Sequence, residues 1–337
     1  MSLFSFPLIF LTLPIGVIIV CALALIITYA IGGLCYLYFM YTFTRKDRDF
    51  SGKHIFIYGG SAGVGKALAL RLAKQGVHLS IAARTDKALK EVQEECQKQN
   101  PVTTCDYYIC DMTKTENVSD ALKTSISKFG FPRLLINTAG IAHPGFLEDV
   151  SYETYQKDMD LNYFGNLRMM KESQKLYNES KTNSDVDIVC VGSCLGLIGS
   201  IGYTAYCPSK YAVKGLVDSL RFEFLGTKMH LHYYGPSNMD TPGFAIENKN
   251  KPKLVQQMED NVKTITADEA AHNLLCNLDK YVITSEPDLE LMKNSATFMS
   301  SAHVSDILSA PLAIMAITFY RWSIENNILK NKKNKSE

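Results

Sequence analysis

Short apolar stretches rich in β-branched residues alternate with amphipathic stretches between residues 53 and 280. The apolar stretches predict strands, and the amphipathic ones, such as 65–76 and 87–99, predict helices. Strands that alternate with helices in this way form a parallel sheet with helices on its faces. We therefore predict one doubly wound α/β domain with a Rossmann fold. The predicted strands are 54–59, 78–84, 104–111, 133–140, 186–193 and 230–236.

The amino-terminal segment follows neither pattern. Residues 1–44 contain no charged side chain, and this apolar run exceeds the ~20 residues that cross a bilayer. It lacks the basic leader and the short apolar core of a secretory signal. We predict a membrane anchor over 1–44, in which Pro14 and the pair Gly32–Gly33 leave a hairpin open as an alternative to a single span. The basic stretch at 45–49 favours a cytosolic position for the domain that follows.

The carboxyl-terminal part carries a second hydrophobic segment, which we place within 291–325, followed by a basic tail at 326–337. The apolar stretch 307–320 is shorter than a membrane span and contains a proline, so it fits an interfacial or re-entrant segment, or a buried core helix. Lys333 and Lys335 resemble the lysine retrieval signal of endoplasmic-reticulum membrane proteins. A basic tail that only aids solubility is the alternative.

Composition excludes several classes of protein. The formal net charge is +1 and 20% of the residues are charged, with the basic residues spread along the chain, so we expect no nucleic-acid partner. The nine cysteines form no CxxC pair and show no Cys/His spacing. They predict reduced thiols on the cytosolic side, and we expect neither a disulfide framework nor a metal site.

A glycine-rich turn follows the first predicted strand. Gly59, Gly63 and Gly65 lie between that strand and the first predicted helix, together with Ser61 and Ala62. Glycines let a ligand approach the backbone closely, and a helix N-terminus offers free N–H groups to a phosphate. In this position the turn predicts a dinucleotide site; a purely structural tight turn is the alternative.

The end of the second predicted strand distinguishes between the two nicotinamide dinucleotides. An acidic residue there would bind the ribose 2′-hydroxyl of NAD, but Ala82 and Ala83 carry no carboxylate. Arg84 offers a guanidinium fork for a 2′-phosphate, and we add Lys87 to the predicted contacts. The sequence therefore favours NADPH, with a solvated loop position as the alternative for Arg84.

Tyr206 and Lys210 stand four positions apart in a predicted helix, so they share one face. An ammonium there would lower the pKa of the phenol toward working pH. By itself the spacing is also that of two ordinary surface residues. Ser193 ends a predicted strand, where ligands bind in open α/β sheets, and Asn162 lies in the predicted helical stretch 158–170.

The glycine turn, "NTAG" at 137–140, Asn162, Ser193 and the Tyr206/Lys210 pair occur in an order that resembles the short-chain dehydrogenase/reductase family. The resemblance covers residues 53 to about 280 and makes 50–290 an NADPH-binding reductase domain. It implies that Tyr206 is the general acid that protonates the carbonyl oxygen as hydride arrives. Lys210 would lower the pKa of that tyrosine and hold the nicotinamide ribose, Ser193 would bind the substrate oxygen, and Asn162 would position a water in the proton relay.

The same resemblance implies further cofactor contacts and two departures. Asp111 matches the adenine contact of the family, with the N-cap of the following helix as an alternative, and Asn137 is a further predicted contact. Tyr58 replaces a threonine that is common before the first glycine. Gly235–Pro236 reverses the usual order of these two residues, which bears on how the nicotinamide amide is held. A homo-oligomer is expected on the same basis.

The substrate is indicated by motifs outside the catalytic set. A membrane-anchored reductase suits a long-chain lipid ketone, and the stretch "DTPGFAIENKNKP" (240–252) resembles the 3-ketodihydrosphingosine reductases. That resemblance implies NADPH-dependent reduction of 3-ketodihydrosphingosine to sphinganine at the endoplasmic-reticulum membrane, with the catalytic domain facing the cytosol. A long-chain 3-ketoacyl-CoA, steroid or retinoid reductase is the alternative enzyme. A non-catalytic binding or scaffold protein is the alternative of another class.

Overall fold

The computed structural model describes residues 6–43, 46–260, 262–286, 289 and 322. The chain forms two compact units, Met1–Lys46 and Asp47–Glu337. The predicted hydrophobic segment 307–320 and the predicted tail 326–337 lie outside the described residues.

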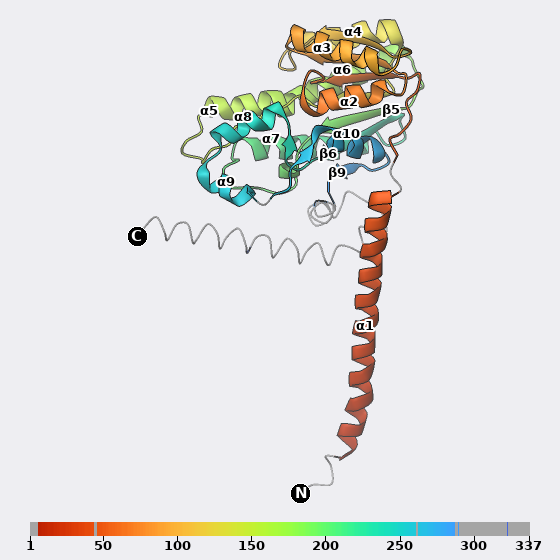
Figure 1. Cartoon of the computed structure of the whole chain (residues 1–337), viewed down its shortest axis with the longest axis vertical. Helices are drawn as coiled ribbons and strands as arrows, with labels where there is room; N and C mark the ends of the chain where they lie inside the picture. Colours follow the sequence, from red (N-terminus) through yellow and green to blue (C-terminus); the bar gives the residue numbers. More distant parts are fainter. Residues whose placement is uncertain (1–5, 44–45, 261, 287–288, 290–321, 323–337) are drawn as a thin grey trace. The chain divides into compact units, whose positions relative to one another are not determined.

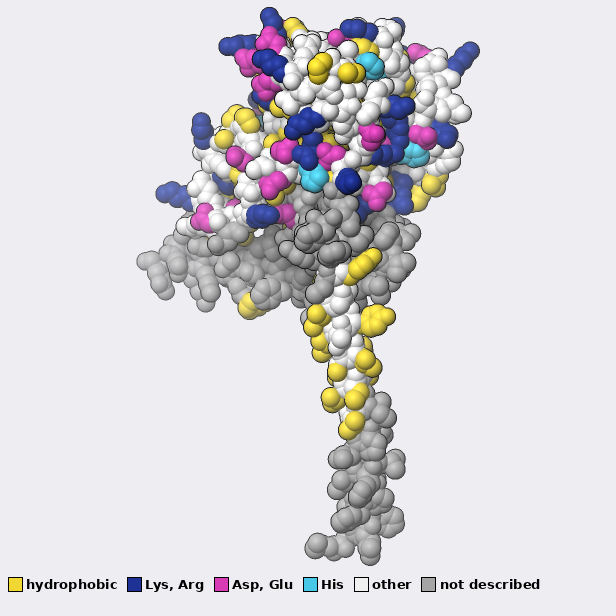
Figure 2. Space-filling view, turned by 45° about the vertical axis from the view of Figure 1, so that its right-hand side comes forward, with side chains coloured by type: hydrophobic (Ala, Val, Ile, Leu, Met, Phe, Trp, Pro, Cys, Tyr) yellow, Lys and Arg dark blue, Asp and Glu magenta, His cyan; other side chains and the backbone are white. Residues whose placement is uncertain are grey.

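The first unit contains one long helix, α1 (Phe6–Phe43). The structure describes the side chains of residues 16–17, 19–34 and 36 in this helix, and they are exposed. They include large apolar side chains such as Val20, Leu25 and Ile26, which are 64 to 67% exposed. Figure 2 shows apolar side chains and no charged ones along this part of α1. Within the described residues, no helix combines the length and the apolar character that crossing a membrane requires.

The second unit is built on a parallel seven-stranded sheet in the order β3-β2-β1-β4-β5-β6-β9. The strands are β1 (His54–Tyr58), β2 (His78–Ala83), β3 (Thr104–Ile109), β4 (Leu134–Asn137), β5 (Val186–Val191), β6 (Met229–Gly235) and β9 (Val282–Thr284). The chain winds outward from β1 in one direction and from β4 in the other, so the order reverses between these two strands. The predicted doubly wound Rossmann fold is confirmed, with β9 as an additional edge strand.

Helices cover both faces of this sheet (Figure 1). Strand residues alternate between the two cores: Ile55 and Ile57 belong to one, and Phe56 and Tyr58 belong to the other. This follows from the two-residue side-chain period of a strand. Because both faces of the sheet are covered, most strand positions are apolar. The helices of the first face are α2 (Gly63–Ala73), α3 (Asp86–Gln99) and α10 (Ala267–Cys276); those of the second are α4 (Thr115–Phe129), α6 (Gly165–Ser180) and α7 (Tyr206–Glu223).

A buried carboxylate ties three parts of the second unit together. Asp187, at the start of β5, has a side chain only 3% exposed and accepts from Arg133 at 2.5 Å. Arg48 lies 3.1 Å from the same oxygen, and His232 Nε2 lies 3.2 Å from the other. Burial by itself raises the pKa of Asp187, but His232 and the two guanidinium groups outweigh it and hold the pKa below the usual value.

A small cap stands apart from the main sheet. Its two-stranded sheet pairs β7 (Met239–Asp240) with β8 (Ile265–Thr266), and its helices are α8 (Pro242–Asn250) and α9 (Lys253–Glu259). Helix α8 begins after Thr241, whose hydroxyl accepts from the Phe244 N–H, with a proline at the first helical position. Helix α8 buries none of its residues, whereas α9 buries Val255 against Tyr203.

Candidate active site

A cavity of about 500 Å³ opens at the carboxyl ends of the strands. Residues that follow six strands line it: Gly59 after β1, Arg84 after β2, Cys110 after β3, Thr138 after β4, Ser193 after β5 and Pro236 after β6. The wall is completed by α8 and by the first turn of α7. A ligand site at the point where strand order reverses is what an open α/β sheet is expected to provide.

The glycine turn forms one end of this cavity. Gly59 has φ +80° and Gly63 has φ +52°, a region of backbone conformation that side chains disfavour. A Cβ atom on Gly65 would lie 2.2 Å from the Gly59 carbonyl oxygen, so only glycine lets α2 start this close to β1. Ala62 at the N-cap makes no side-chain capping bond, which leaves the first N–H groups of α2 to a ligand. The cradle therefore suits a pyrophosphate.

Only some of the remaining predicted cofactor contacts line the cavity. Ser61, Ala62 and Arg84 line the cavity, but Lys87, Asp111 and Asn137 are not part of its lining. The buried Asn137 accepts from the Ala139 N–H at 3.0 Å.

The alternative of Asp111 as a helix N-cap is wrong. Helix α4 begins at Thr115 and Lys114 occupies the cap position. Asp111 instead closes a local turn by accepting from the backbone N–H and the hydroxyl of Thr113, both at 2.9 Å.

Ser193, Tyr206 and Lys210 all line the cavity. Ser193 follows β5 and its hydroxyl accepts from the Leu195 N–H at 3.1 Å, which caps the short 3₁₀ helix η2 (Cys194–Gly196). Tyr233 from β6 holds the serine backbone from behind, because its hydroxyl donates to the Ser193 carbonyl oxygen at 2.7 Å and accepts from the Ser193 N–H at 3.1 Å. The serine is thus fixed by a buried side chain of the neighbouring strand.

Lys210 lies in a buried position one helical turn after Tyr206. Its Nζ is 5.4 Å from the centre of the Tyr206 ring and donates to the Val191 carbonyl oxygen at 3.3 Å. Burial lowers the pKa of Lys210 to about 8, and the nearby Asp158 carboxylate opposes this change.

The phenol does not have the lowered pKa that the sequence predicts. Burial raises the pKa of Tyr206 well above its ordinary value, and the negative charge of Glu247 raises it further, while a hydrogen bond with Ser193 opposes both. Tyr206 therefore stays protonated until negative charge develops beside it, which suits a proton donor.

Asn162 is buried and does not line the cavity. It lies in a π-helical turn, η1 (Met159–Phe164), which separates α5 (Tyr152–Asp158) from α6 where the sequence predicts one continuous helix. Its side chain clamps the strand-end loop, because its Oδ1 accepts from the Ile141 N–H and its Nδ2 donates to the Ile141 carbonyl oxygen, both at 2.9 Å. Its contact with a relay water stays a prediction.

Three further cavity residues were not assigned roles from the sequence. His143 Nδ1 lies 2.5 Å from Asp158 Oδ1 and faces the cavity from the loop after β4. Tyr203 and Glu247 both line the cavity, and the Tyr203 hydroxyl donates to Glu247 at 2.6 Å. The motif at 240–252 includes Glu247, but the contact with Tyr203 depends on tertiary structure that no local pattern displays.

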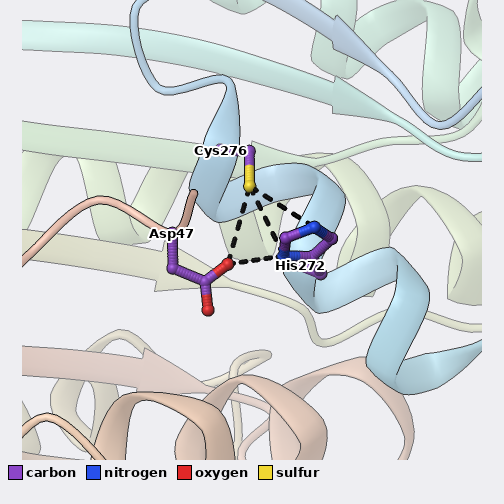
Figure 3. Close-up of side chains that lie close together, drawn as sticks. All are labelled: Asp47, His272 and Cys276. Carbon is purple, nitrogen blue, oxygen red and sulfur yellow. Dashed lines mark hydrogen bonds and ion pairs between the residues drawn. The ribbon is translucent and has the colours of Figure 1, made fainter. Parts of the chain in front are cut away.

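A separate polar cluster lies at the end of α10 (Figure 3). Asp47 Oδ1 lies 2.6 Å from His272 Nδ1, and Cys276 Sγ lies 3.4 Å from the same nitrogen. Among the described residues, the ligand atoms of these three side chains lie close enough together, within 4.8 Å, to hold a metal ion. However, Arg71 donates to Asp47 Oδ2 at 2.5 Å and lies 2.8 Å from that histidine nitrogen. We interpret the cluster as an ion-pair network that fastens Asp47 to α10, because a guanidinium occupies the space beside the nitrogen.

Comparison with known proteins relates the chain to one enzyme family. Residues 53–252 match the short chain dehydrogenase family. The 3-ketodihydrosphingosine reductase of Dictyostelium discoideum is 30% identical over 313 residues, which cover 87% of this chain and 93% of that one. The 3-dehydrosphinganine reductase of Danio rerio is 31% identical over 256 residues, covering 71% of this chain and 76% of that protein.

Solved structures show the same fold. An alcohol dehydrogenase from Thermococcus sibiricus complexed with 5-hydroxy-NADP has a TM-score of 0.59 at 22% identity, covering 69% of this chain and 95% of that one. A short chain dehydrogenase/reductase from Burkholderia phymatum in complex with NAD has a TM-score of 0.63 at 20% identity, covering 74% of this chain and 94% of that one. At these identities the likeness establishes the fold alone.

Proposed function

Because the chain belongs to the short chain dehydrogenase family, we propose that it reduces the 3-keto group of 3-ketodihydrosphingosine to sphinganine with NADPH. The observation that carries the reaction type is the meeting of Ser193, Tyr206 and Lys210 in the cavity that the glycine turn closes at its other end. The substrate is supported by relatives of that name, one of which aligns over 87% of this chain.

The residues of the cavity fit a nicotinamide dinucleotide phosphate. The Gly65 cradle and the uncapped start of α2 suit the pyrophosphate, since a Cβ in this turn would close it. Arg84 lines the cavity beyond β2, where a 2′-phosphate would need a cation, and the last residues of β2, Ala82 and Ala83, offer no carboxylate to a 2′-hydroxyl. The bound cofactor would supply the hydride.

The chain's own residues supply the proton and the charge stabilisation. The Tyr206 phenol donates its proton to the ketone oxygen, and the Ser193 hydroxyl donates a hydrogen bond to the same oxygen. Lys210, with a pKa of about 8, is largely protonated at neutral pH and stabilises the phenolate that remains. These donors are held by α7 and by Tyr233, so they need little rearrangement as charge develops on the oxygen.

We place the enzyme at the endoplasmic-reticulum membrane with residues 1–44 as the anchor and the reductase domain in the cytosol. The absence of charged residues from 1–44 and the basic stretch that follows support this placement. Asn117 and Asn178 stand in glycosylation sequons and are both exposed, so they report topology. Expression in microsomes should leave both unglycosylated, and a glycan on either would place the domain in the lumen.

The activity is tested with the detergent-solubilised full chain. NADPH oxidation with 3-ketodihydrosphingosine should yield sphinganine, and NADH should support a lower rate. Turnover of a long-chain 3-ketoacyl-CoA alone would discard the substrate and keep the reaction type.

Substitution of the proposed acid separates an enzyme from a scaffold. Tyr206→Phe should lower turnover by about 100- to 10,000-fold while NADPH binding persists. Tyr211→Phe is the matched control, because Tyr211 lies on the same helix, is 44% exposed and is not part of the cavity lining. A chain whose turnover survives Tyr206→Phe does not use this phenol.

A further inference from the structure

A cluster of charged side chains borders the cavity on the side of α8 and α9. The Tyr203 hydroxyl lies 2.6 Å from Glu247 Oε1 and 2.9 Å from Glu259 Oε1, so its single proton is shared between the two carboxylates. Lys251 lies 2.6 Å from Glu259 and 3.4 Å from Glu247. We call these four residues the Glu247 cluster. All of them are well shielded from solvent, since the charged side chains are 2 to 20% exposed.

The Glu247 cluster has an uneven charge. Two carboxylates, Glu247 and Glu259, surround the single ammonium of Lys251, so the formal sum is −1. Lys251 lies closer to Glu259 than to Glu247 by 0.8 Å, from 2.6 and 3.4 Å. Glu247 lines the cavity, whereas Glu259 and Lys251 are not part of the lining. The less neutralised carboxylate is therefore the one that a ligand can reach.

This carboxylate lies close to the reacting end of the cavity. The rings of Tyr203 and Tyr206 are 6.0 Å apart, and Tyr203 is hydrogen-bonded to Glu247. The charge of Glu247 also raises the pKa of Tyr206, second only to burial, which is the effect of an anion acting through a shielded environment. The buried negative charge of Glu247 repels the negative charge that develops on the substrate oxygen beside Tyr206. A positive charge on the substrate would offset this repulsion.

We propose that Glu247 binds the ammonium group of an amino ketone, and so selects a substrate that carries a cation on the carbon next to the reacting carbonyl. The inference rests on the proposed function, because 3-ketodihydrosphingosine has its amino group in that position. With the carbonyl oxygen at Tyr206 and Ser193, the neighbouring ammonium lies in the same part of the cavity as Glu247. The ion pair neutralises the surplus negative charge of the Glu247 cluster. The charge of Glu247 then acts less strongly on the Tyr206 phenol.

The pair predicts a preference among lipid ketones. A neutral ketone of the same chain length leaves Glu247 without a partner, and a coenzyme A thioester brings negative phosphates toward a negative site. Discrimination of this kind arises from a charged group that only one substrate satisfies.

The test compares 3-ketodihydrosphingosine with the chain-matched ketone that lacks the amino group. The quantity measured is the ratio of kcat/KM for the two substrates, with NADPH, in the detergent-solubilised full chain. Glu247→Gln keeps an acceptor for Tyr203 and removes the charge, so the ratio should fall by about 10- to 100-fold. Glu247→Asp retains the charge and should preserve most of the ratio.

Glu259→Gln is the matched control. It removes the same charge from the Glu247 cluster at a residue that does not line the cavity. Lys251 can then pair more closely with Glu247, so the ratio should fall, but by less than in Glu247→Gln, which removes the contacting carboxylate itself. A thermal melt of each variant confirms that it is folded.

The possible outcomes separate the two proposals. A wild-type enzyme that reduces both ketones equally well, or an unchanged ratio in Glu247→Gln, overturns the role of Glu247 and leaves the proposed function standing. Equal losses in Glu247→Gln and Glu259→Gln overturn direct contact. A wild-type chain that reduces neither ketone overturns the proposed function and this inference with it.

Discussion

Replacing Lys210 with methionine should stabilise the cofactor-free protein at pH 7 while it removes activity. Burial lowers the pKa of Lys210 from 10.5 to about 8, which means that the folded protein holds this ammonium at a cost. At about 1.4 kcal/mol per pKa unit, the cost is on the order of 3 kcal/mol. Methionine fills a similar volume without charge, but it loses the hydrogen bond to Val191, which contributes about 1 kcal/mol. The expected net gain at pH 7 is therefore about 1 to 2 kcal/mol, or a few degrees in melting temperature.

The pH dependence identifies the cause. Between about pH 8 and 10.5, the ordinary pKa of a lysine, the unfolded chain binds a proton at Lys210 that the folded chain does not, so wild-type stability rises with pH across this window. The methionine variant lacks this rise. The gap between the two proteins should be largest below pH 8 and should shrink by pH 9.5, as measured by thermal melts of the detergent-solubilised chain followed by circular dichroism.

Lys214→Met is the control on the same helix. Lys214 is also buried, but both oxygens of Asp218 lie 2.5 and 2.7 Å from its Nζ, so its removal should destabilise the protein. If Lys210→Met lowers the melting temperature at pH 7, or if its advantage is the same at pH 7 and 9.5, then Lys210 is not held in a charged state that burial disfavours.

Two other substitutions test the cofactor cradle and the core. Gly65→Ala places a Cβ 2.2 Å from the Gly59 carbonyl oxygen and should weaken NADPH binding by at least about 10-fold in a fluorescence titration. The control is Gly215→Ala, whose Cβ meets no atom within 4 Å and which should bind NADPH normally. Equal NADPH binding by both variants would contradict the role of the glycine turn in holding the pyrophosphate. Asp187→Asn should cost about 3 kcal/mol at pH 7 in urea unfolding. The folded pKa of Asp187 lies below its unfolded value, so the stability advantage of the wild type is present above about pH 4 and is lost as the pH falls further. A stability difference between the two proteins that persists at low pH would show that the Asp187 charge is not its cause.

The sequence predicts the central strands well because most of their residues are apolar. Ile55 to Tyr58 must be apolar on both faces of a covered sheet, and this is visible without any tertiary information. Strand β9 has only three residues and β7 and β8 have two each, so they exist because partners lie beside them, not because of their own pattern.

The catalytic residues could be found by spacing, but their electrostatics could not. The separation of Tyr206 and Lys210 places both on one face of a helix, as their position in α7 shows. The pKa of Tyr206 depends on burial and on Glu247, which approaches from a helix about forty residues later, and so the predicted lowering of that pKa did not hold. The π turn at Asn162 likewise depends on the loop at Ile141 that its side chain clamps.

Helix α8 has a consequence for the evolution of this enzyme. It lines the cavity and contributes Glu247, yet none of its residues belongs to the core. Substitutions on α8 can therefore change which lipids are accepted with little effect on folding, whereas the turn at Gly65 has no room for a side chain and Lys210 is required by the proposed chemistry. Divergence in substrate choice and preservation of the hydride chemistry can proceed independently, because they are assigned to different parts of the chain.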